Sequence, residues 1–238
     1  MARKQRRALL RHLQVVRPDL EDPIGAIEAG RVRVSGRILS NPAAMVEPDA
    51  PVVVMSPRQL RGSKKLRAAL GAFGIAVAGR VALDLGAAAG GFTRVLLERG
   101  VTRVYAVDVG HGQLLGSLRR DPRVVNLERT NLASLDRRLI PEEIEVVTID
   151  LSYLSVARAL GQLRGVAFAD GAELVALVKP MFELGLGRAP THEDVLEEAG
   201  RRASQGALAA DWRPTGLIPS SIGGAKGTRE LLLHAVRA

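Results

Sequence analysis

Four side chains capable of chemistry each stand at the end of a short apolar run. Asp84, Asp108 and Asp150 are acids, and Lys179 is a base. Short apolar runs bounded by turn-forming residues are typical of buried parallel strands. Parallel strands end at a common edge of their sheet, where ligands bind. We therefore expect these four side chains to gather at one carboxyl edge.

Residues 81–93, VALDLGAAAGGFT, predict a ligand site on this edge. They read as a strand, a tight loop of small residues and the start of a helix. Glycines let a ligand lie against the backbone, and free N–H groups at a helix start can hold an anionic group. The candidate cofactor-binding residues of this stretch are Asp84, Gly86, Gly90, Gly91 and Phe92.

The glycine spacing favours S-adenosylmethionine over NAD. A dinucleotide fingerprint reads Gly-x-Gly-x-x-Gly, whereas Gly86 here begins the pattern Gly-x-x-x-Gly-Gly. Asp108, at the end of the predicted strand 103–108, is placed to accept hydrogen bonds from a ribose diol. Asn131 would face an adenine, or it could be a turn residue. Asp84 and Asp108 could likewise serve only as loop caps.

Composition excludes several classes of function. The chain has 238 residues, of which 47% are hydrophobic, so it can form one large α/β domain and a small appendage. Cysteine is absent, which excludes disulfides, thiolate zinc sites and a thiol nucleophile. No cluster of His, Asp and Glu has ligand spacing, so we expect no metal. Without a signal core or a spanning segment, we expect a cytoplasmic protein with no membrane partner.

The net charge of +9 is concentrated in the first part of the chain. Residues 1–67 contain 14 Lys and Arg against 6 Asp and Glu, whereas the remaining 171 residues contain 20 against 19. Such a distribution predicts a surface for a phosphate backbone. A solvated basic face that binds nothing is the alternative.

Lysine is scarce among the basic residues. Of 34 Lys and Arg only five are Lys, namely Lys4, Lys64, Lys65, Lys179 and Lys226. Lysine is compact and can lose its proton when buried, unlike arginine. Lys65 falls in the first turn of a helix predicted over residues 64–73, where the positive helix end disfavours a cation. That misfit argues for a role rather than for a simple surface lysine.

Residues 1–54 predict a small α+β module. A basic helix over 1–20 is interrupted by prolines, and a second helix ends at Gly30. An alternating strand, a turn at Ser35-Gly36 and a last strand follow. The pieces EAGRVRVSG and VEPDAPVVV resemble the S4-type RNA-binding domain, with a shortened helical front half. The RNA-binding candidates are Arg31, Arg33 and Arg37 of this module, together with Arg61 and Lys64 beyond it.

Residues 55–63 are predicted to be a linker, and residues 64–238 a second domain in which strands and helices alternate. Such alternation predicts an α/β fold, a mostly parallel sheet with helices on both faces. Predicted helices cover 114–118, 155–165 and 191–210. The remaining strands are predicted at 123–127, 145–150, 173–179, 216–218 and 230–234.

Separated segments in a fixed order carry a family resemblance. They are RGSKKLRAAL, VALDLGAAAGGFTRVLLERG, VYAVDVGHGQL, RVVNLERTN, IDLSYLS, ALVKPMFE and GAKGTRELLL. Together they resemble the haemolysin-A (TlyA-type) ribosomal RNA 2′-O-methyltransferases. The resemblance implies a Rossmann-like class I S-adenosylmethionine-dependent domain of the FtsJ type, and an rRNA cytidine in a ribosomal subunit as substrate. The family's Lys–Asp–Lys–Glu set falls on Lys65, Asp150, Lys179 and Glu230.

Those four residues suit methylation of a ribose hydroxyl. The hydroxyl is a poor nucleophile. Its alignment with the methyl group therefore contributes more to catalysis than removal of its proton, with effective molarities of about 10⁵ M or more in good cases. Lys179 would steer the 2′-oxygen or act as a base, Asp150 would orient it, and Lys65 and Glu230 would complete the charge balance. A structural Asp150–Lys179 ion pair is the alternative.

Two other functions compete with this interpretation. One is an RNA-binding or ribosome-associated protein that keeps the fold without turnover. The other is a membrane-active haemolysin, which the lack of a strongly apolar amphipathic helix disfavours. The chain also departs from the family pattern at Arg61-Gly62-Ser63 and in the loop 184–190, and the loop bears on RNA docking.

Overall fold

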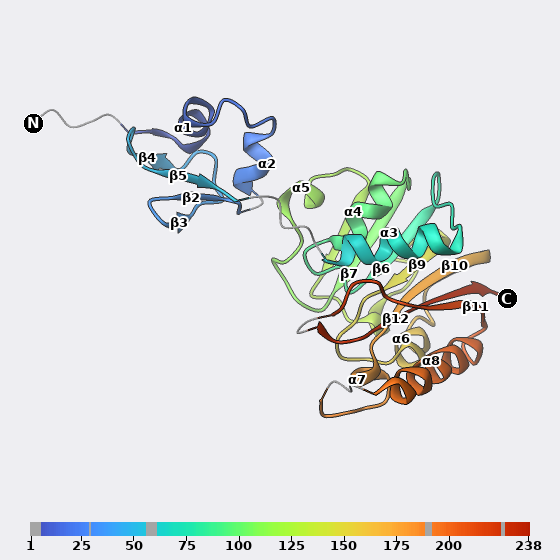
Figure 1. Ribbon diagram of the computed structural model, residues 1–238. Coiled ribbons are helices and arrows are strands. Elements are labelled where there is room, and N and C mark those ends of the chain that lie inside the picture. The colour runs from blue at the N-terminus through green and yellow to red at the C-terminus, as the bar shows by residue number, and fades with distance from the viewer. Residues whose placement is uncertain (1–5, 29, 56–60, 189–191, 225–226) are drawn as a thin grey trace, which may run out of the picture. The chain divides into compact units, whose positions relative to one another are not determined.

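The computed structural model describes residues 6–28, 30–55, 61–188, 192–224 and 227–238 (Figure 1). The chain divides into two compact units. The first comprises Met1–Gln59 with Leu115–Asp121, and the second comprises Leu60–Leu114 with Pro122–Ala238. Each unit is described by itself below.

The first unit is a small α+β module. Its elements are β1 (Arg7–Ala8), α1 (Leu9–Val16), α2 (Pro23–Glu28), β2 (Val32–Val34), β3 (Arg37–Ile38), β4 (Met45–Val46), β5 (Val52–Val54) and α5 (Gly116–Arg119). Strand β2 pairs antiparallel with both β3 and β5, and β1 pairs with β4. Leu9, Leu13, Ile27 and Val32 are fully buried and form the centre of its core.

Two details of this unit differ from the sequence expectation. The helix predicted over residues 1–20 begins only at Leu9, because Arg7–Ala8 pair as a strand with Met45–Val46. Pro23 opens α2 rather than interrupting a helix, which suits a residue without a backbone N–H.

The turn predicted at Ser35-Gly36 is confirmed. Ser35 and Gly36 have φ of 49° and 81°, the paired positive values of a type I′ hairpin.

The second unit is built on a seven-stranded sheet in the order β11-β12-β10-β9-β6-β7-β8. Its strands are β6 (Val81–Leu85), β7 (Arg103–Asp108), β8 (Val124–Glu128), β9 (Ile144–Ile149), β10 (Phe168–Val178), β11 (Trp212–Pro219) and β12 (Leu231–Arg237). The five strands from β8 to β10 are parallel, and β12 runs antiparallel to both of its neighbours. The predicted α/β class with a mostly parallel sheet is confirmed.

Helices cover both faces of this sheet. They are α3 (Arg61–Phe73), α4 (Gly91–Glu98), α6 (Val156–Gly161), α7 (Pro180–Glu183) and α8 (Glu193–Leu208), with a 3₁₀ turn, η1, at Leu132–Ser134. Helices α3 and α4 lie over one face, and α6 and α8 lie over the other (Figure 1). The central strands β6, β7 and β9 are buried on both sides, which explains why their sequences read as continuous apolar runs, whereas the edge strand β11 alternates.

Three further helices have boundaries that differ from the prediction. Helix α3 begins at Arg61, so Lys65 lies beyond the first turn and the argument from the positive helix end is wrong. The helix predicted over 155–165 ends at Gly161, and the one predicted over 114–118 is the short α5. Beyond α6 the buried Leu163 and Val166 pack into the core as loop residues, so apolar spacing alone overestimated the helix.

The second unit contains a fully buried carboxylate. Asp84 accepts hydrogen bonds from the hydroxyl of Thr93 on α4 at 2.6 Å and from that of Thr148 on β9 at 2.8 Å. Desolvation raises the pKa of Asp84 to about 6, although the two threonine hydroxyls oppose this. Asp84 therefore joins three elements behind the glycine loop rather than facing open space.

Replacing Asp84 by Asn should remove a pH-dependent loss of stability. Between pH 3.8 and about 6 the folded state keeps a proton that the unfolded state has released, so stability falls as pH rises through this window and stays lower above it. Unfolding free energies should show Asp84→Asn gaining up to about 3 kcal/mol on the wild type from pH 3.8 to pH 7, at 1.36 kcal/mol per pKa unit. A difference that is flat across this range would contradict the buried-carboxylate account.

Candidate active site

The glycine loop touches the tip of strand β9 through Gly86. Gly86 has a φ of 85°, and a Cβ at this position would lie 2.5 Å from the backbone oxygen of Asp150. Only glycine satisfies both conditions. The Asp150 N–H also donates to the Leu85 carbonyl at 2.9 Å. The loop that follows β6 and the residue that follows β9 are therefore held side by side.

Helix α3 packs its first turn on the same loop. The Ser63 hydroxyl donates to the Gly91 carbonyl at 2.8 Å. A Cβ on Gly62 would come within 3.2 Å of the Phe92 ring, which is itself buried. Ser63, which departs from the family pattern, thus fastens α3 to the start of α4. This contact sets the position from which Lys65 extends.

Asp108 and Glu128 organise the next loop. Asp108 accepts from the Ala88 N–H at 2.9 Å and from the Gly110 N–H at 2.7 Å. Glu128 accepts from the N–H groups of Gln113 and Leu114 at 2.7 Å and 3.0 Å. Desolvation disfavours the Glu128 charge, but backbone N–H groups led by that of Leu114 outweigh it and lower its pKa to about 2. Our sequence reasoning missed Glu128, although it ends a strand at the same edge.

Asn131 has the local role of a turn residue. Its side-chain oxygen accepts from the Ala133 N–H at 3.0 Å and caps the 3₁₀ turn η1. The residue is exposed. This is the conformation that the turn alternative predicts, and contact with an adenine is a proposal.

The loop and its surroundings fit an elongated cofactor with a carboxylate at one end. Gly90 caps α4 without a side-chain hydrogen bond, and the first turn of α4 carries no acidic residue. An incoming carboxylate would therefore meet backbone N–H groups rather than a competing side chain. Asp108 lies next to this loop through its bond to Ala88 and offers acceptors suited to hydroxyl groups.

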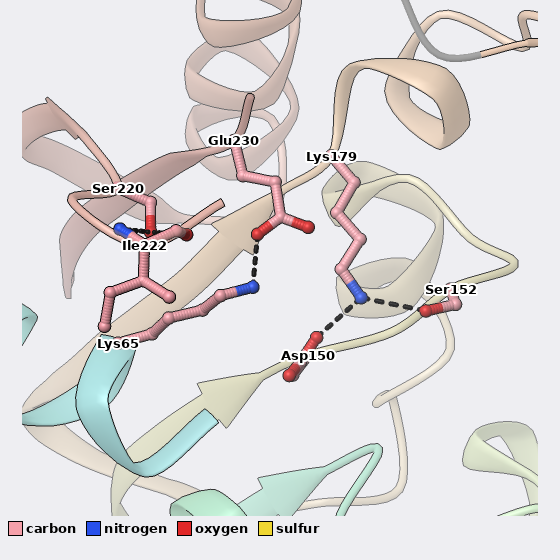
Figure 2. A network of polar contacts seen from close by, with 7 residues as sticks. All are labelled: Lys65, Asp150, Ser152, Lys179, Ser220, Ile222 and Glu230. Carbon is pink, nitrogen blue, oxygen red and sulfur yellow. Dashed lines mark hydrogen bonds and ion pairs between the residues drawn. The ribbon is translucent and has the colours of Figure 1, made fainter. Parts of the chain in front are cut away.

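The four residues of the Lys–Asp–Lys–Glu set come together at the carboxyl edge (Figure 2). Lys65 extends from α3, Asp150 follows β9, Lys179 follows β10 and Glu230 precedes β12. They form two ion pairs, Lys65 with Glu230 and Lys179 with Asp150. The structure thus brings into one site residues from four elements that are widely separated in sequence.

The Lys65–Glu230 pair is buried. Each residue is only 5% exposed, and the Lys65 ammonium donates to Glu230 Oε2. Gly224 closes over the carboxylate, since a Cβ there would lie 2.2 Å from Glu230 Oε1. Removing one partner of such a pair typically costs about 3–5 kcal/mol because the other charge stays buried. The pair is therefore a fixed part of the site rather than an adaptable one.

The Lys179–Asp150 pair is more accessible. Lys179 Nζ lies 2.6 Å from Asp150 Oδ1, and the two side chains are 15% and 27% exposed. The same nitrogen donates to the Ser152 hydroxyl oxygen at 2.8 Å (Figure 2). Our sequence reasoning missed Ser152, whose one signal is its place two residues after Asp150. A substrate oxygen can reach this lysine, whereas Lys65 is enclosed.

The RNA-binding candidates divide between the two units. In the first unit Arg33 and Arg37 are exposed and Arg31 is partly buried, all on or beside the β2–β3 hairpin. In the second unit Lys64 is exposed on α3, and the side chain of Arg61 lies outside what the structure describes.

The described part of the chain offers neither a metal-binding cluster nor a membrane-spanning helix. It contains no group of three or more His, Cys, Asp or Glu that could hold a metal ion. Within the same residues, no helix is long and apolar enough to cross a membrane.

Known proteins resemble both the sequence and the fold. A family model described as FtsJ-like methyltransferase matches residues 59–235. The 16S/23S rRNA (cytidine-2′-O)-methyltransferase TlyA of Mycobacterium tuberculosis is 43% identical over 216 residues, covering 87% of this chain and 80% of that protein. Hemolysin A of Brachyspira hyodysenteriae is 34% identical and covers 88% and 90% of the two chains.

Solved structures agree. A structure assigned as a hemolysin from Streptococcus thermophilus superposes with a TM-score of 0.71 at 28% identity, covering 99% of this chain and 90% of that one. Magnesium protoporphyrin IX methyltransferase of Synechocystis with bound SAH shares the fold at a TM-score of 0.51 and 17% identity, covering 74% and 81%. With the family model over residues 59–235 and a TlyA relative 43% identical across most of its length, this protein belongs to the FtsJ-like methyltransferase family, among its TlyA-type members.

Proposed function

We propose that this protein transfers a methyl group from S-adenosylmethionine to a ribose 2′-hydroxyl of ribosomal RNA, at a cytidine. The observation that carries the proposal is the accessible Lys179–Asp150 pair, which lies beside the glycine loop through the contact of Gly86 with Asp150. The name of the Mycobacterium tuberculosis relative states methylation at the cytidine 2′-oxygen of 16S and 23S rRNA.

S-adenosylmethionine supplies an electrophilic methyl group when bound. The candidate residues to hold it are Asp84, Gly86, Gly90, Gly91, Phe92, Asp108 and Asn131. Asp84 and Phe92 are buried and would act by shaping the loop from behind. Asp108 and the backbone of the loop would contact the cofactor directly, and Asn131 would border the adenine.

Lys179 would contact the reacting hydroxyl. Its amino group lies at the end of β10 and would hold the 2′-oxygen in line with the methyl group, since alignment is the larger part of such catalysis. As a neutral amine with a lone pair, it would also receive the proton that the hydroxyl loses and become an ammonium. Asp150, at 2.6 Å, would stabilise the resulting ammonium.

Lys65 and Glu230 would support the reaction from behind this pair. Their mutual charge compensation lets two ionised groups persist in a buried place. Because Glu230 neutralises the Lys65 ammonium, the pair would complete the charge balance of the site beside Lys179 and Asp150.

Residues 1–54 are proposed to be an S4-like RNA-binding domain that delivers rRNA to the second domain, residues 64–238, across the linker 55–63. Support comes from the α+β module with its exposed Arg33 and Arg37 and from the excess of basic residues in residues 1–67. The protein would act on a ribosomal subunit and thus in the cytoplasm. A binding protein without turnover would not require both ion pairs at the edge of the sheet.

Cofactor choice can be measured by calorimetry. S-adenosylmethionine and S-adenosylhomocysteine should bind, whereas NAD should give no signal. Asp108→Ala should weaken binding by about 10- to 100-fold, because a charged acceptor for a ligand hydroxyl is lost. The control is Asp170→Ala, an exposed acid at the opposite end of β10, which should bind normally. Tight binding of NAD without response to either sulfur compound would overturn the assignment.

RNA binding should depend on the arginines of the β2–β3 hairpin and on salt concentration. Replacing Arg31, Arg33 and Arg37 by Gln should lower RNA affinity and reduce the slope of log affinity against log salt concentration by about 3, one per lost phosphate contact. Cofactor affinity should not change. The charge-matched control replaces Arg137, Arg138 and Arg201, which lie on the second unit. An equal slope for both triple variants would show that only net charge matters.

The catalytic role of Lys179 can be separated from an ion-pair role. Lys179→Arg keeps the charge, but the guanidinium is wider and cannot release its proton. Single-turnover methyl transfer to rRNA should fall by about 10²–10⁴ in both Lys179→Arg and Lys179→Ala, with cofactor binding retained. Arg164→Lys, a charge-conserving exchange at an exposed position after α6, is the control and should remain active. Near-normal transfer by Lys179→Arg would reduce Lys179 to a structural partner of Asp150.

A further inference from the structure

Lys179 has two fixed hydrogen-bond acceptors rather than one. Its Nζ atom lies 2.6 Å from Asp150 Oδ1 and 2.8 Å from Ser152 Oγ (Figure 2). A lysine ammonium carries three N–H donors, and a neutral amine carries two N–H donors and one lone pair. In both forms, two of the three directions around Nζ are therefore engaged by these acceptors.

The chain supplies both acceptors from one short segment. Asp150 and Ser152 are two residues apart in the segment that follows β9, and Leu151 between them is buried. Leu151 packs toward Gly86, since a Cβ on that glycine would lie 3.1 Å from Leu151 Cδ2. The backbone bends at Ser152, and the side chains of Asp150 and Ser152 both contact Lys179. The anchored Leu151 thus holds in place the segment from which both acceptors reach Lys179.

We propose that Ser152 is a positioning residue, which with Asp150 sets the rotation of the Lys179 amino group so that its third direction faces the ribose 2′-oxygen. This inference rests on the proposed function and names a residue that the Lys–Asp–Lys–Glu set does not contain. With Asp150 alone, the lone pair of the neutral amine can take either of the two staggered positions that the Asp150 bond leaves open. With both acceptors, one orientation of the neutral amine satisfies both bonds, and its lone pair has a single direction.

Ser152 acts through Lys179 and does not change the charge of the site. Its exposed position leaves room for a larger side chain, so a Ser152→Thr variant can retain the hydroxyl. Ser155 offers a matched control in the same loop. Its side chain caps α6 by accepting from the Arg158 N–H and does not take part in the lysine contact.

The first measurement is single-turnover methyl transfer to rRNA as a function of RNA concentration, with melting temperatures for each full-length variant. Ser152→Ala should lower the maximal rate by about 10-fold, and by no more than about 100-fold, with half-saturation by RNA unchanged. Ser152→Cys, similar in size but a weak acceptor, should behave like Ala, and Ser152→Thr should restore the rate. Ser155→Ala should lower the melting temperature and keep the rate.

The second measurement does not depend on activity. The chain has only five lysines, so Cε–Nζ NMR signals of a lysine-labelled sample are few, and that of Lys179 is identified by its loss in Lys179→Arg. The Lys179 amino group should rotate faster in Ser152→Ala than in the wild type or in Ser155→Ala. Unchanged rotation in Ser152→Ala would overturn the positioning role, even if the wild type methylates RNA. A wild type without methyl transfer but with faster rotation in Ser152→Ala would reject the proposed function and keep the contact.

Discussion

The close approach of Gly86 to the backbone of Asp150 is the constraint on which the site depends. No side chain fits between them, because a Cβ would lie 2.5 Å from a carbonyl oxygen. The glycine loop is consequently held against the end of β9, and Asp150 is presented directly beside the start of α4. Every later contact builds on this position, since Asp150 holds Lys179 and Ser63 fastens α3 to the same loop. A wider spacing between Gly86 and Asp150 would separate the glycine loop from the charged residues.

The two ion pairs differ in their exposure to solvent, and this difference suits them to different roles. Lys65 and Glu230 are 165 positions apart and join the first helix of the second unit to its last strand in a buried place. Breaking such a pair leaves an uncompensated buried charge, so it is costly to lose and slow to rearrange. The Lys179–Asp150 pair is partly open to solvent, which lowers its energetic value but leaves its lysine within reach of a ligand. We therefore propose that the buried pair holds the site together and that the open pair contacts the substrate.

Much of the sheet could be predicted from sequence, because each buried strand is a short apolar run with a polar tip. Asp108 ends β7 and Asp150 follows β9, as their apolar runs predict. Asp84 instead lies within β6, and its burial depends on Thr93 and Thr148, which only the fold brings near. Family resemblance placed Lys65 and Glu230 in one set, but only the structure shows that they pair, as no local pattern relates residues so far apart. Helix ends were the least predictable feature, because Arg7–Ala8 pair with a distant strand and α6 stops while its apolar spacing continues.

The presence of lysine rather than arginine at position 179 has a physical reason. Arginine serves for most basic residues of the chain, yet lysine occupies both cationic positions of the paired site. A guanidinium binds a carboxylate through a planar fork and would occupy Asp150 with both of its oxygens. An ammonium is a compact point charge that bonds Asp150 through one oxygen and still has donors to spare. At Lys179 one donor goes to Ser152 and one direction stays free, a division that a guanidinium in the same place does not permit.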